Sequence, residues 1–245
     1  MEVQYFAFQG WFSPYPTAVP TKSPVVFLFD VDNTLLSNDD IVADLKAYLR
    51  REVGARRQAE YWRIFEELRD EMGYADYLGA LQRYRNEHPR DPHLLLLSRF
   101  MIDYPFHKRV YPKAFDAIAR ARKLGRAVIL SDGDVVFQPR KVDRSGLGRA
   151  VLGQVLIYVH KEKELDDVAK RHPARHYVLI DDKLRILTAV KAAWGSRVTT
   201  IFVRQGHYAT DRKILSTYPP ADLALERIGD FVKCDLQSVL KEKRN

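Results

Sequence analysis

The stretch FLFDVDNTLL, residues 27–36, carries two aspartates, Asp30 and Asp32, directly after a run of apolar residues. The run from Val25 to Phe29 is short, continuous and rich in β-branched and aromatic side chains, which predicts a fully buried strand. Because side chains at i and i+2 of an extended chain point to the same face, the two carboxylates would share one small volume. That arrangement is unfavourable unless a cation or a shared proton compensates the repulsion. The alternative is a simple turn, since Asp, Asn and Thr favour turns and helix N-caps.

Length and composition predict a globular protein. The chain has 245 residues, with 46% hydrophobic and 11% aromatic residues, enough for one large domain or one domain with an insertion. No run approaches the roughly eighteen apolar residues that a transmembrane helix needs, so a membrane partner is not expected. A single cysteine, Cys234, excludes an intrachain disulfide and a cysteine metal cluster. With no secretory signal at the start, a cytoplasmic location is expected.

The chain carries a formal net charge of +8, which admits two kinds of partner. A basic protein attracts nucleic acid or acidic small molecules. The lysines and arginines are spread along the sequence without a block of like charges, so a solvated surface that favours anionic ligands is the better interpretation. Nucleic acid is the less favoured partner, and the sequence leaves the oligomeric state open. Residues 1–23, with three prolines and several aromatic residues, are expected to form an extended arm.

Apolar residues recur at helical spacing throughout residues 38–105, and no convincing strand interrupts them. Ser37 is a suitable N-cap at the start of this segment, and Gly73 is a suitable stop within it. We interpret the aromatic residues of the segment as the core of a helical bundle. Four helices are predicted, at residues 41–49, 61–72, 77–84 and 94–101.

Strands and helices alternate from Tyr111 onward, which predicts a parallel sheet covered on both faces. The strand at residues 25–29 belongs with this group by its apolar character. We therefore expect an α/β core, formed by residues 24–37 and 106–245, into which an all-helical domain of residues 38–105 is inserted. The further strands are predicted at residues 127–130, 155–159, 177–180, 198–203 and 222–225, and the helices at 112–125, 164–171 and 184–194.

Polar residues follow four of the predicted strands, at the ends where parallel sheets bind ligands. Each group is weak evidence alone, but together they place acidic, hydroxyl and cationic side chains along one edge of the sheet. Several carboxylates at one place need compensation, and a divalent cation suits their oxygens. The residues are Asp30 and Asp32, then Ser131, Asp132 and Gly133, then His160 and Lys161, and finally Asp181 and Asp182.

Asp30-Val31-Asp32-Asn33-Thr34 resembles the first motif of the haloacid dehalogenase (HAD) superfamily of phosphotransferases. Ser131, Lys161 and the pair Asp181-Asp182 resemble its second, third and fourth motifs, in the same order. The resemblance implies a Rossmann-like three-layer α/β core, and the helical segment stands where the family carries its C1-type caps.

A second similarity points to the phosphatase branch of the superfamily, which includes nucleotidases and phosphoglycolate phosphatase. It rests on the stretch from Ser131 to Asp134, followed by Gln138, Lys141 and Gly146-Leu147. Asp32 agrees with it. By this resemblance, dehalogenases lack an acid two residues after the nucleophile, and transport ATPases carry a Lys-Thr pair there.

The resemblance also implies roles for the acidic residues at the sheet edge. Asp30 would attack the phosphorus and form an aspartyl-phosphate, while Asp32 would protonate the leaving oxygen and then activate water. Mg²⁺ would be bound by Asp30, the main-chain carbonyl of Asp32 and Asp182, with Asp181 as an accessory ligand.

The remaining predicted site residues would hold the phosphoryl group. Ser131 would bind one phosphoryl oxygen together with nearby backbone N–H groups, and Lys161 would neutralise the charge of the group. Asp132 and Gly133 are expected to contact the substrate. Lys163 competes with Lys161 for its role, and Lys161 is favoured because it lies nearer the end of the strand.

These residues predict a magnesium-dependent phosphomonoester hydrolase that acts on a small phosphorylated metabolite, such as a nucleotide or a phosphoglycolate-like compound. The identity of the substrate stays open, because side chains of the helical segment would set it. Two alternatives keep the fold: a phosphatase for nucleic-acid ends, motivated by the net charge, and a non-catalytic phosphate-binding module. Arg140 and Lys141 could also meet an anionic group of the substrate.

Overall fold

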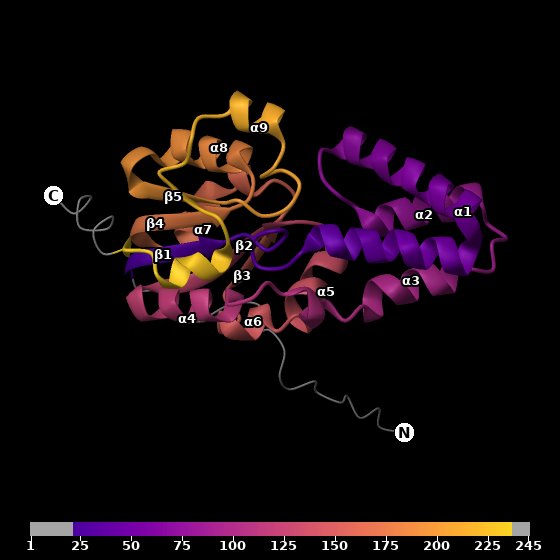
Figure 1. Ribbon diagram of the computed structural model, residues 1–245, viewed down its shortest axis with the longest axis horizontal. Helices are drawn as coiled ribbons and strands as arrows, with labels where there is room; N and C mark the ends of the chain where they lie inside the picture. The colour runs from indigo at the N-terminus through magenta and orange to yellow at the C-terminus, as the bar shows by residue number, and fades with distance from the viewer. Residues whose placement is uncertain (1–21, 237–245) are drawn as a thin grey trace, which may run out of the picture.

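The computed structural model describes residues 22–236, so almost all of the predicted N-terminal arm lies outside the described residues. Within them, six parallel strands form one sheet in the order β3-β2-β1-β4-β5-β6 (Figure 1). Every predicted strand is present, which confirms the α/β fold. The strands are β1 (Ser23–Phe29), β2 (Arg126–Asp132), β3 (Val155–Tyr158), β4 (Ala174–Asp181), β5 (Val198–Val203) and β6 (Leu223–Leu225).

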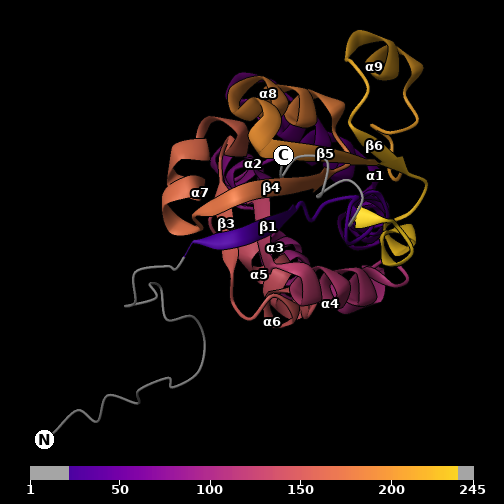
Figure 2. The same cartoon turned by 90° about the vertical axis from the view of Figure 1, so that its left-hand side faces the viewer.

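Helices cover both faces of the sheet, because successive side chains of each strand enter two different cores. Phe27 of β1 packs in the core that includes α4 (Ala114–Leu124). Leu28, the next residue, packs in the core that includes α7 (Leu165–Arg171) and α8 (Leu184–Trp194). Figure 2 shows α4 on one side of the sheet and α7 and α8 on the other. The resulting three layers are those expected for a doubly covered parallel sheet.

Three helices occupy the segment between β1 and β2 that is predicted to be helical. They are α1 (Asn38–Met72), α2 (Tyr77–Glu87) and α3 (Leu94–Asp103), and together they are called the helical insertion here. The insertion extends beyond the carboxyl ends of the strands (Figure 1). Its apolar side chains belong to the same core as those of α4, so the insertion packs against the α/β part of the chain.

The two helices predicted at residues 41–49 and 61–72 are one element, α1, with a kink at Gly54. The φ angle of Gly54 is 85°, a left-handed conformation that glycine adopts without a side-chain clash. Gly73 ends α1 as predicted, with a φ of 76° and its N–H donated to the carbonyl of Arg69. Although α1 is long, none of the helices within residues 22–236 is apolar enough over a sufficient length to span a bilayer.

Among the described residues, three short α-helices lie outside the predicted ones: α5 (Phe137–Arg144), α6 (Leu147–Ala150) and α9 (Arg212–Thr217). The buried positions of α5 include Gln138 and Lys141. Helices are predicted from the regular spacing of apolar residues, and a buried polar side chain does not add to that spacing. The sequence pattern therefore does not indicate α5.

The chain leaves the sheet for the helical insertion and returns to it at neighbouring points. The N–H of Ser37 donates to the carbonyl of Arg109 at 2.7 Å, and the N–H of Tyr111 donates to the carbonyl of Leu35 at 2.9 Å. The outgoing and returning linkers therefore pair with each other. Arg109 also donates to the carboxylate of Asp44 in α1 at 3.1 Å, which fixes the first helix of the insertion at this join.

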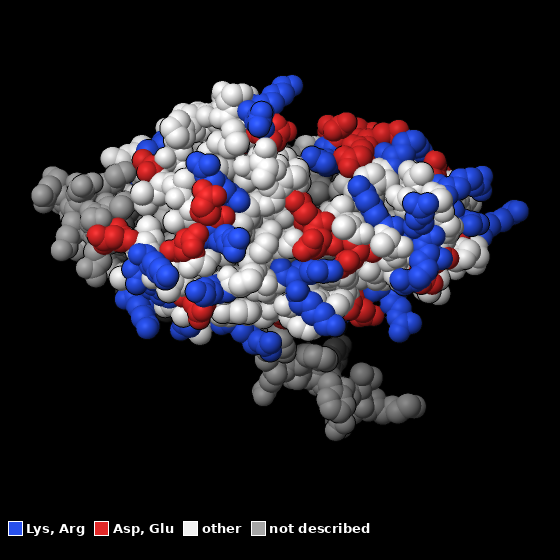
Figure 3. Space-filling view, viewed as in Figure 1, with Lys and Arg blue, Asp and Glu red and all other residues white. Residues whose placement is uncertain are grey.

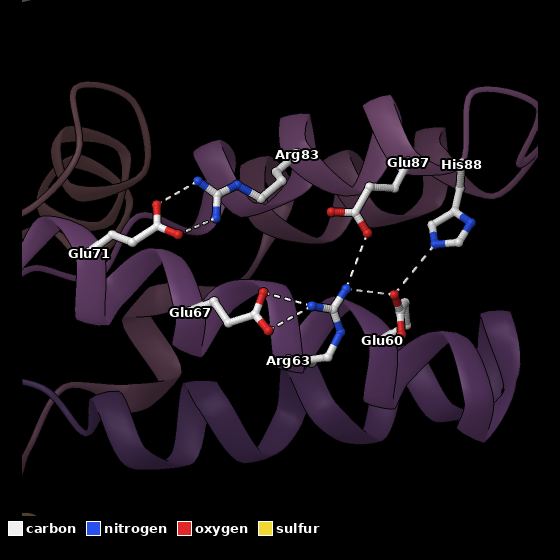
Figure 4. A network of polar contacts seen from close by, with 7 residues as sticks. All are labelled: Glu60, Arg63, Glu67, Glu71, Arg83, Glu87 and His88. Carbon is white, nitrogen blue, oxygen red and sulfur yellow. Dashed lines mark hydrogen bonds and ion pairs between the residues drawn. The ribbon is translucent and has the colours of Figure 1, made fainter.

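Ion pairs join α1 to α2 on the surface of the helical insertion (Figure 4). Arg63 of α1 contacts Glu60, Glu67 and Glu87 at 2.8, 2.6 and 3.1 Å. These side chains are well exposed, so each pair contributes little to stability. Glu60, Glu87 and His88 are close enough to bind a metal ion, but Arg63 already supplies positive charge to both carboxylates.

We expect Gly125→Ala to destabilise the fold. Gly125 lies between α4 and β2, and a Cβ atom there would stand 2.3 Å from the carbonyl oxygen of Val25 in β1. Because relief of this clash requires a shift of backbone in a central strand, we expect a loss of about 2–4 kcal/mol in the free energy of unfolding. Urea unfolding measures it. Gly148→Ala is the matched control: its Cβ would lie 3.4 Å from a side-chain atom of Val142, so stability should change by less than about 1 kcal/mol.

Candidate active site

The carboxyl ends of β1, β2 and β4 meet at the centre of the sheet and carry most of the predicted site residues. β1 pairs with β2 on one side and with β4 on the other, so the order of the chain reverses next to β1. Open α/β sheets bind ligands at such a reversal. Asp30 follows β1 directly, Ser131 and Asp132 end β2, and Asp181 ends β4 with Asp182 next to it.

Lys161 occupies the centre of this site. Its Nζ lies 2.5 Å from Oδ1 of Asp30 and 2.7 Å from Oδ2 of Asp181, and the side chain is fully buried. Burial by itself would lower the pKa of Lys161, but the carboxylates of Asp181 and Asp30 outweigh burial and raise the pKa well above its usual value. The ammonium therefore stays charged. Lys163, the alternative in the sequence, is exposed to solvent and does not reach this place.

Asp30, Asp181 and Asp182 form a buried acidic cluster in which one carboxylate oxygen of each lies within 4.8 Å of the others. Among the described residues, neither oxygen of Asp182 nor Oδ2 of Asp30 has a hydrogen-bond partner. Burial raises the pKa of Asp182 well above its usual value and that of Asp181 to about 6. Converging carboxylate oxygens without partners suit a hard divalent cation, so the acidic cluster fits the magnesium ion that the resemblance implies.

Lys183 brings a second positive charge to the acidic cluster. Burial would lower the pKa of Lys183, but the carboxylates of Asp182 and Asp30 together outweigh burial and raise it. Its backbone N–H donates to Oδ1 of Asp181 at 2.8 Å. When all three are ionised, the carboxylates of the cluster outnumber the two lysines, and this excess of negative charge favours the binding of a divalent cation.

The polar residues at the end of β2 are arranged around Lys161. Oγ of Ser131 accepts an N–H from Gln138 at 2.9 Å, and the hydroxyl's own contact, to the carbonyl of Asp132, is long at 3.4 Å. Oδ1 of Asp132 accepts the backbone N–H of Lys161 at 2.7 Å and so fixes the loop that carries this lysine. The N–H of Gly133 donates to a carbonyl of β3 at 3.0 Å, so it is part of the sheet's hydrogen bonding.

The carboxylate of Asp32 stands apart from the acidic cluster. Its side chain is 24% exposed, and Nζ of Lys141 binds both oxygens, at 2.7 and 2.9 Å. Lys141 itself is fully buried. The sequence analysis connects Lys141 with the site through the similarity to the phosphatase branch and as a contact for an anionic group of the substrate, and neither connection indicates the pairing with Asp32. No local pattern indicates the ion pair, because its partners are 109 residues apart.

The turn after Asp32 connects the site to the helical insertion. Asn33 has a left-handed φ of 58°, and its Oδ1 accepts the backbone N–H groups of Asn38 and Asp39 at 3.0 and 3.1 Å. Asp39 in turn accepts the backbone N–H of His207 at 2.8 Å, in the loop that follows β5. The first turn of α1 is therefore bound both to the turn that contains Asp32 and Asn33, called the site loop here, and to the α/β core.

A cavity of about 300 Å³ lies between the helical insertion and the carboxyl ends of the strands. Asp32 lies on its wall, whereas Asp30 is only 2% exposed. Arg69 of α1 reaches across to the core and donates to the hydroxyl of Tyr208 at 2.9 Å. Sequence reasoning missed this contact, because its partners are 139 residues apart. The cavity is also lined by Tyr74, Tyr77, Phe137, Asp132, Gly133 and Lys183.

The model of the haloacid dehalogenase-like hydrolase family matches residues 25–193, a stretch that contains all of the predicted site residues. The chain belongs to this family. A solved haloacid dehalogenase-like hydrolase of Burkholderia xenovorans LB400 is 64% identical, with a TM-score of 0.84. That comparison covers 86% of this chain and 99% of the other.

More distant structures share the fold of this HAD-like hydrolase. L-2-haloacid dehalogenase of Xanthobacter autotrophicus is 18% identical, with a TM-score of 0.55 over 85% of this chain and 96% of that one. The HAD-hydrolase YfnB of Bacillus subtilis, bound to magnesium, is 16% identical, with a TM-score of 0.57 over 88% of this chain and 98% of that one. At such identities the likeness concerns the fold alone. No curated protein matches the chain.

We expect Asp182→Asn to stabilise the metal-free HAD-like hydrolase, because asparagine removes a buried carboxylate neither of whose oxygens has a hydrogen-bond partner among the described residues. In chelator, the variant should melt at a temperature at least as high as that of the wild type. Magnesium should raise the melting temperature of the wild type but not that of the variant. Asp166→Asn, at an exposed position of α7, is the control and should respond to magnesium as the wild type does. If magnesium raised the melting temperature of the wild type and of Asp182→Asn equally, the ion would bind elsewhere.

Lys161→Met should strongly destabilise the HAD-like hydrolase in chelator. The substitution leaves Asp30 and Asp181 buried without the cation that they share, at a cost of about 3–5 kcal/mol in the free energy of unfolding. Lys163→Met removes an exposed lysine two residues on and should change this free energy by no more than about 0.5 kcal/mol. Chemical denaturation of both variants measures the difference. Similar small losses would show that Lys161 does not pair with the acidic cluster in solution.

Proposed function

We propose that this HAD-like hydrolase is a magnesium-dependent phosphatase that hydrolyses small phosphate monoesters through an aspartyl-phosphate. The observation that chiefly supports it is the position of Asp32, whose carboxylate lies on the cavity wall two residues after the buried Asp30. A proton donor at the wall can serve the oxygen that leaves with the rest of the substrate. Displacement of a halide needs no such donor, because halide leaves without a proton.

Three carboxylates would bind the magnesium ion. Within residues 22–236, Asp30 and Asp182 have oxygens without hydrogen-bond partners that lie near each other, and Asp181 is close enough to be an accessory ligand. When bound, the ion would screen the negative charges of the nucleophile and the phosphoryl oxygens from each other. The pairing of Lys161 with Asp30 and Asp181 supplies part of the same screening from the protein itself.

One oxygen of Asp30 is suited to nucleophilic attack. Lys161 holds Oδ1 at 2.5 Å, and Oδ2 has no hydrogen-bond partner among the described residues. Attack by Oδ2 forms a bond to phosphorus as the bond from phosphorus to the leaving oxygen breaks, and Asp32 donates a proton to that oxygen. Water then attacks the phosphorus and gives a proton to Asp32. Inorganic phosphate leaves, and the carboxylate of Asp30 is regenerated.

Ser131 and Lys161 would stabilise the group in transfer. The oxygen of Ser131 already accepts a hydrogen bond from Gln138, so its hydroxyl proton can be donated to a phosphoryl oxygen. The ammonium of Lys161 offsets the charge on the phosphoryl oxygens in the transition state. Both side chains are buried, where such interactions are stronger than in water.

The cavity and the surface charge favour a small substrate over a nucleic-acid end. A volume of about 300 Å³ is at the small end of ligand pockets, and the helical insertion forms one wall. On the face in Figure 3, lysines and arginines are interspersed with acidic residues, and the described residues there form no continuous basic stripe. Binding along a phosphate backbone would call for such a stripe.

The proposal predicts magnesium-dependent release of phosphate from p-nitrophenyl phosphate and from at least one member of a panel of metabolite phosphates. Chelator should abolish the release. Asp30→Asn should lower kcat by about 10³-fold or more without unfolding the protein, because the amide is a poor nucleophile. Lys163→Met should retain the wild-type rate, since that lysine is exposed and outside the site.

Other outcomes would support other activities. Metal-independent chloride release from 2-chloropropionate would indicate a dehalogenase. A strong preference for phosphorylated oligonucleotides over mononucleotides would support the nucleic-acid alternative. Absence of turnover with every ester, together with no beryllium fluoride adduct on Asp30, would support a non-catalytic module.

A further inference from the structure

Lys141 is a second fully buried lysine beside the site, and the proposed reaction does not use it. Its ammonium has an acceptor for each of its three protons: Oδ1 and Oδ2 of Asp32 at 2.7 and 2.9 Å, and Oδ1 of Asn38 at 2.9 Å. The ring centroid of Phe137 lies 5.1 Å from Nζ. No proton of the ammonium is left for a ligand, so any effect of Lys141 on a reaction passes through its partners.

The contacts of Lys141 join three parts of the molecule. Lys141 lies on α5 of the core, Asp32 belongs to the site loop, and Asn38 is the first residue of α1. The side chain of Asn38 also lies close to the hydroxyl of Tyr77 in α2. The ring of Tyr77 packs on that of Phe137, with centroids 4.8 Å apart. The ammonium thus lies where the α/β core and the helical insertion meet.

Asp32 needs a constraint from outside its own loop. A carboxylate that is 24% exposed at a cavity wall can rotate about two side-chain bonds, whereas proton transfer requires a fixed place near the leaving oxygen. Two hydrogen bonds from one buried ammonium fix both the position and the plane of this carboxylate. In return, the carboxylate supplies the negative charge without which a buried Lys141 would be strongly unfavourable.

We propose that Lys141 is a positioning residue, which holds the carboxylate of Asp32 at the cavity wall, directed at the leaving oxygen, and ties it to α1 through Asn38. This inference rests on the proposed phosphatase activity, in which Asp32 carries the proton. Loss of Lys141 should slow the departure of the leaving group in particular. The acidic cluster and Lys161, which bind metal and phosphate in that proposal, make their contacts without Lys141.

Two kinds of ester separate this role from a general structural one. An alkyl phosphate needs its leaving oxygen protonated, whereas p-nitrophenolate is stable enough to leave without a proton. Lys141→Met should therefore lower kcat by about 10²-fold for an alkyl phosphate, but only slightly for p-nitrophenyl phosphate, with little change in either KM. Asp32→Asn should show the same selectivity. The double variant should be no slower than Asp32→Asn alone, because the two residues act as a unit.

Three further measurements keep the inference falsifiable. Lys163→Met is the matched control, and both of its rates should equal those of the wild type. If Lys141→Met does not fold, Asn38→Ala removes only the third hydrogen bond of the ammonium and should show the same selectivity in weaker form. Thermal unfolding should show Asp32→Asn to be less stable than the double variant, because the single change leaves a buried ammonium without its carboxylate.

Equal loss of rate for the two esters would overturn the positioning role and leave Lys141 a purely structural residue. If the double variant lost rate by the product of the two single losses, the positioning role would be overturned as well. It would also be overturned if the losses in melting temperature of the two single variants added up in the double variant. Failure of the proposed function has a different signature, since the wild type would then hydrolyse neither ester. In that case both the phosphatase activity and the positioning role of Lys141 would be refuted.

Discussion

Asp30, Asp181 and Asp182 place three carboxylates inside the protein, each at most 2% exposed, where a charge without compensation costs several kcal/mol. Lys161 compensates two of them directly, and Lys183 lies next to the third. The carboxylate oxygens that have no hydrogen-bond partner in the described part of the chain suit a divalent cation. Because these groups come from the ends of neighbouring parallel strands, the register of the sheet sets their spacing, and the rest of the fold serves to hold that edge together.

The helical insertion divides the site into two environments. Asp30 lies in the inner one, where low exposure strengthens its interactions with Lys161 and with a phosphoryl group. Asp32 borders the cavity and is partly exposed, so it can exchange a proton with water between the two halves of the proposed reaction. A nucleophile benefits from removal of water, but an acid–base residue has to remain in contact with it. The boundary between cavity and core therefore suits the division of roles between the two aspartates.

The strands and the buried part of the site could be predicted from the sequence for one physical reason. A strand covered on both faces is a continuous apolar run, and a polar residue directly after it has to lie at the edge of the sheet. No such rule applies to α5, whose inward positions are partly polar, or to the contact between Lys141 and Asp32, which pairs residues distant in the chain. The kink at Gly54 was not predictable either, because a glycine between two periodic segments indicates a stop as readily as a bend.

The close spacing of Asp30 and Asp32 is tolerated because the structure gives each carboxylate its own buried lysine. An extended chain would direct both side chains to one face, but Asp30 pairs with Lys161 beside β4, while Asp32 pairs with Lys141 at the base of the insertion. The two ammonium groups come from different elements, α5 and the short 3-10 helix η2 (Lys161–Lys163) that follows β3. A change at one pair therefore need not disturb the other. Such independence is what a two-step reaction requires, because the nucleophile has to stay a carboxylate while its neighbour gains and loses a proton.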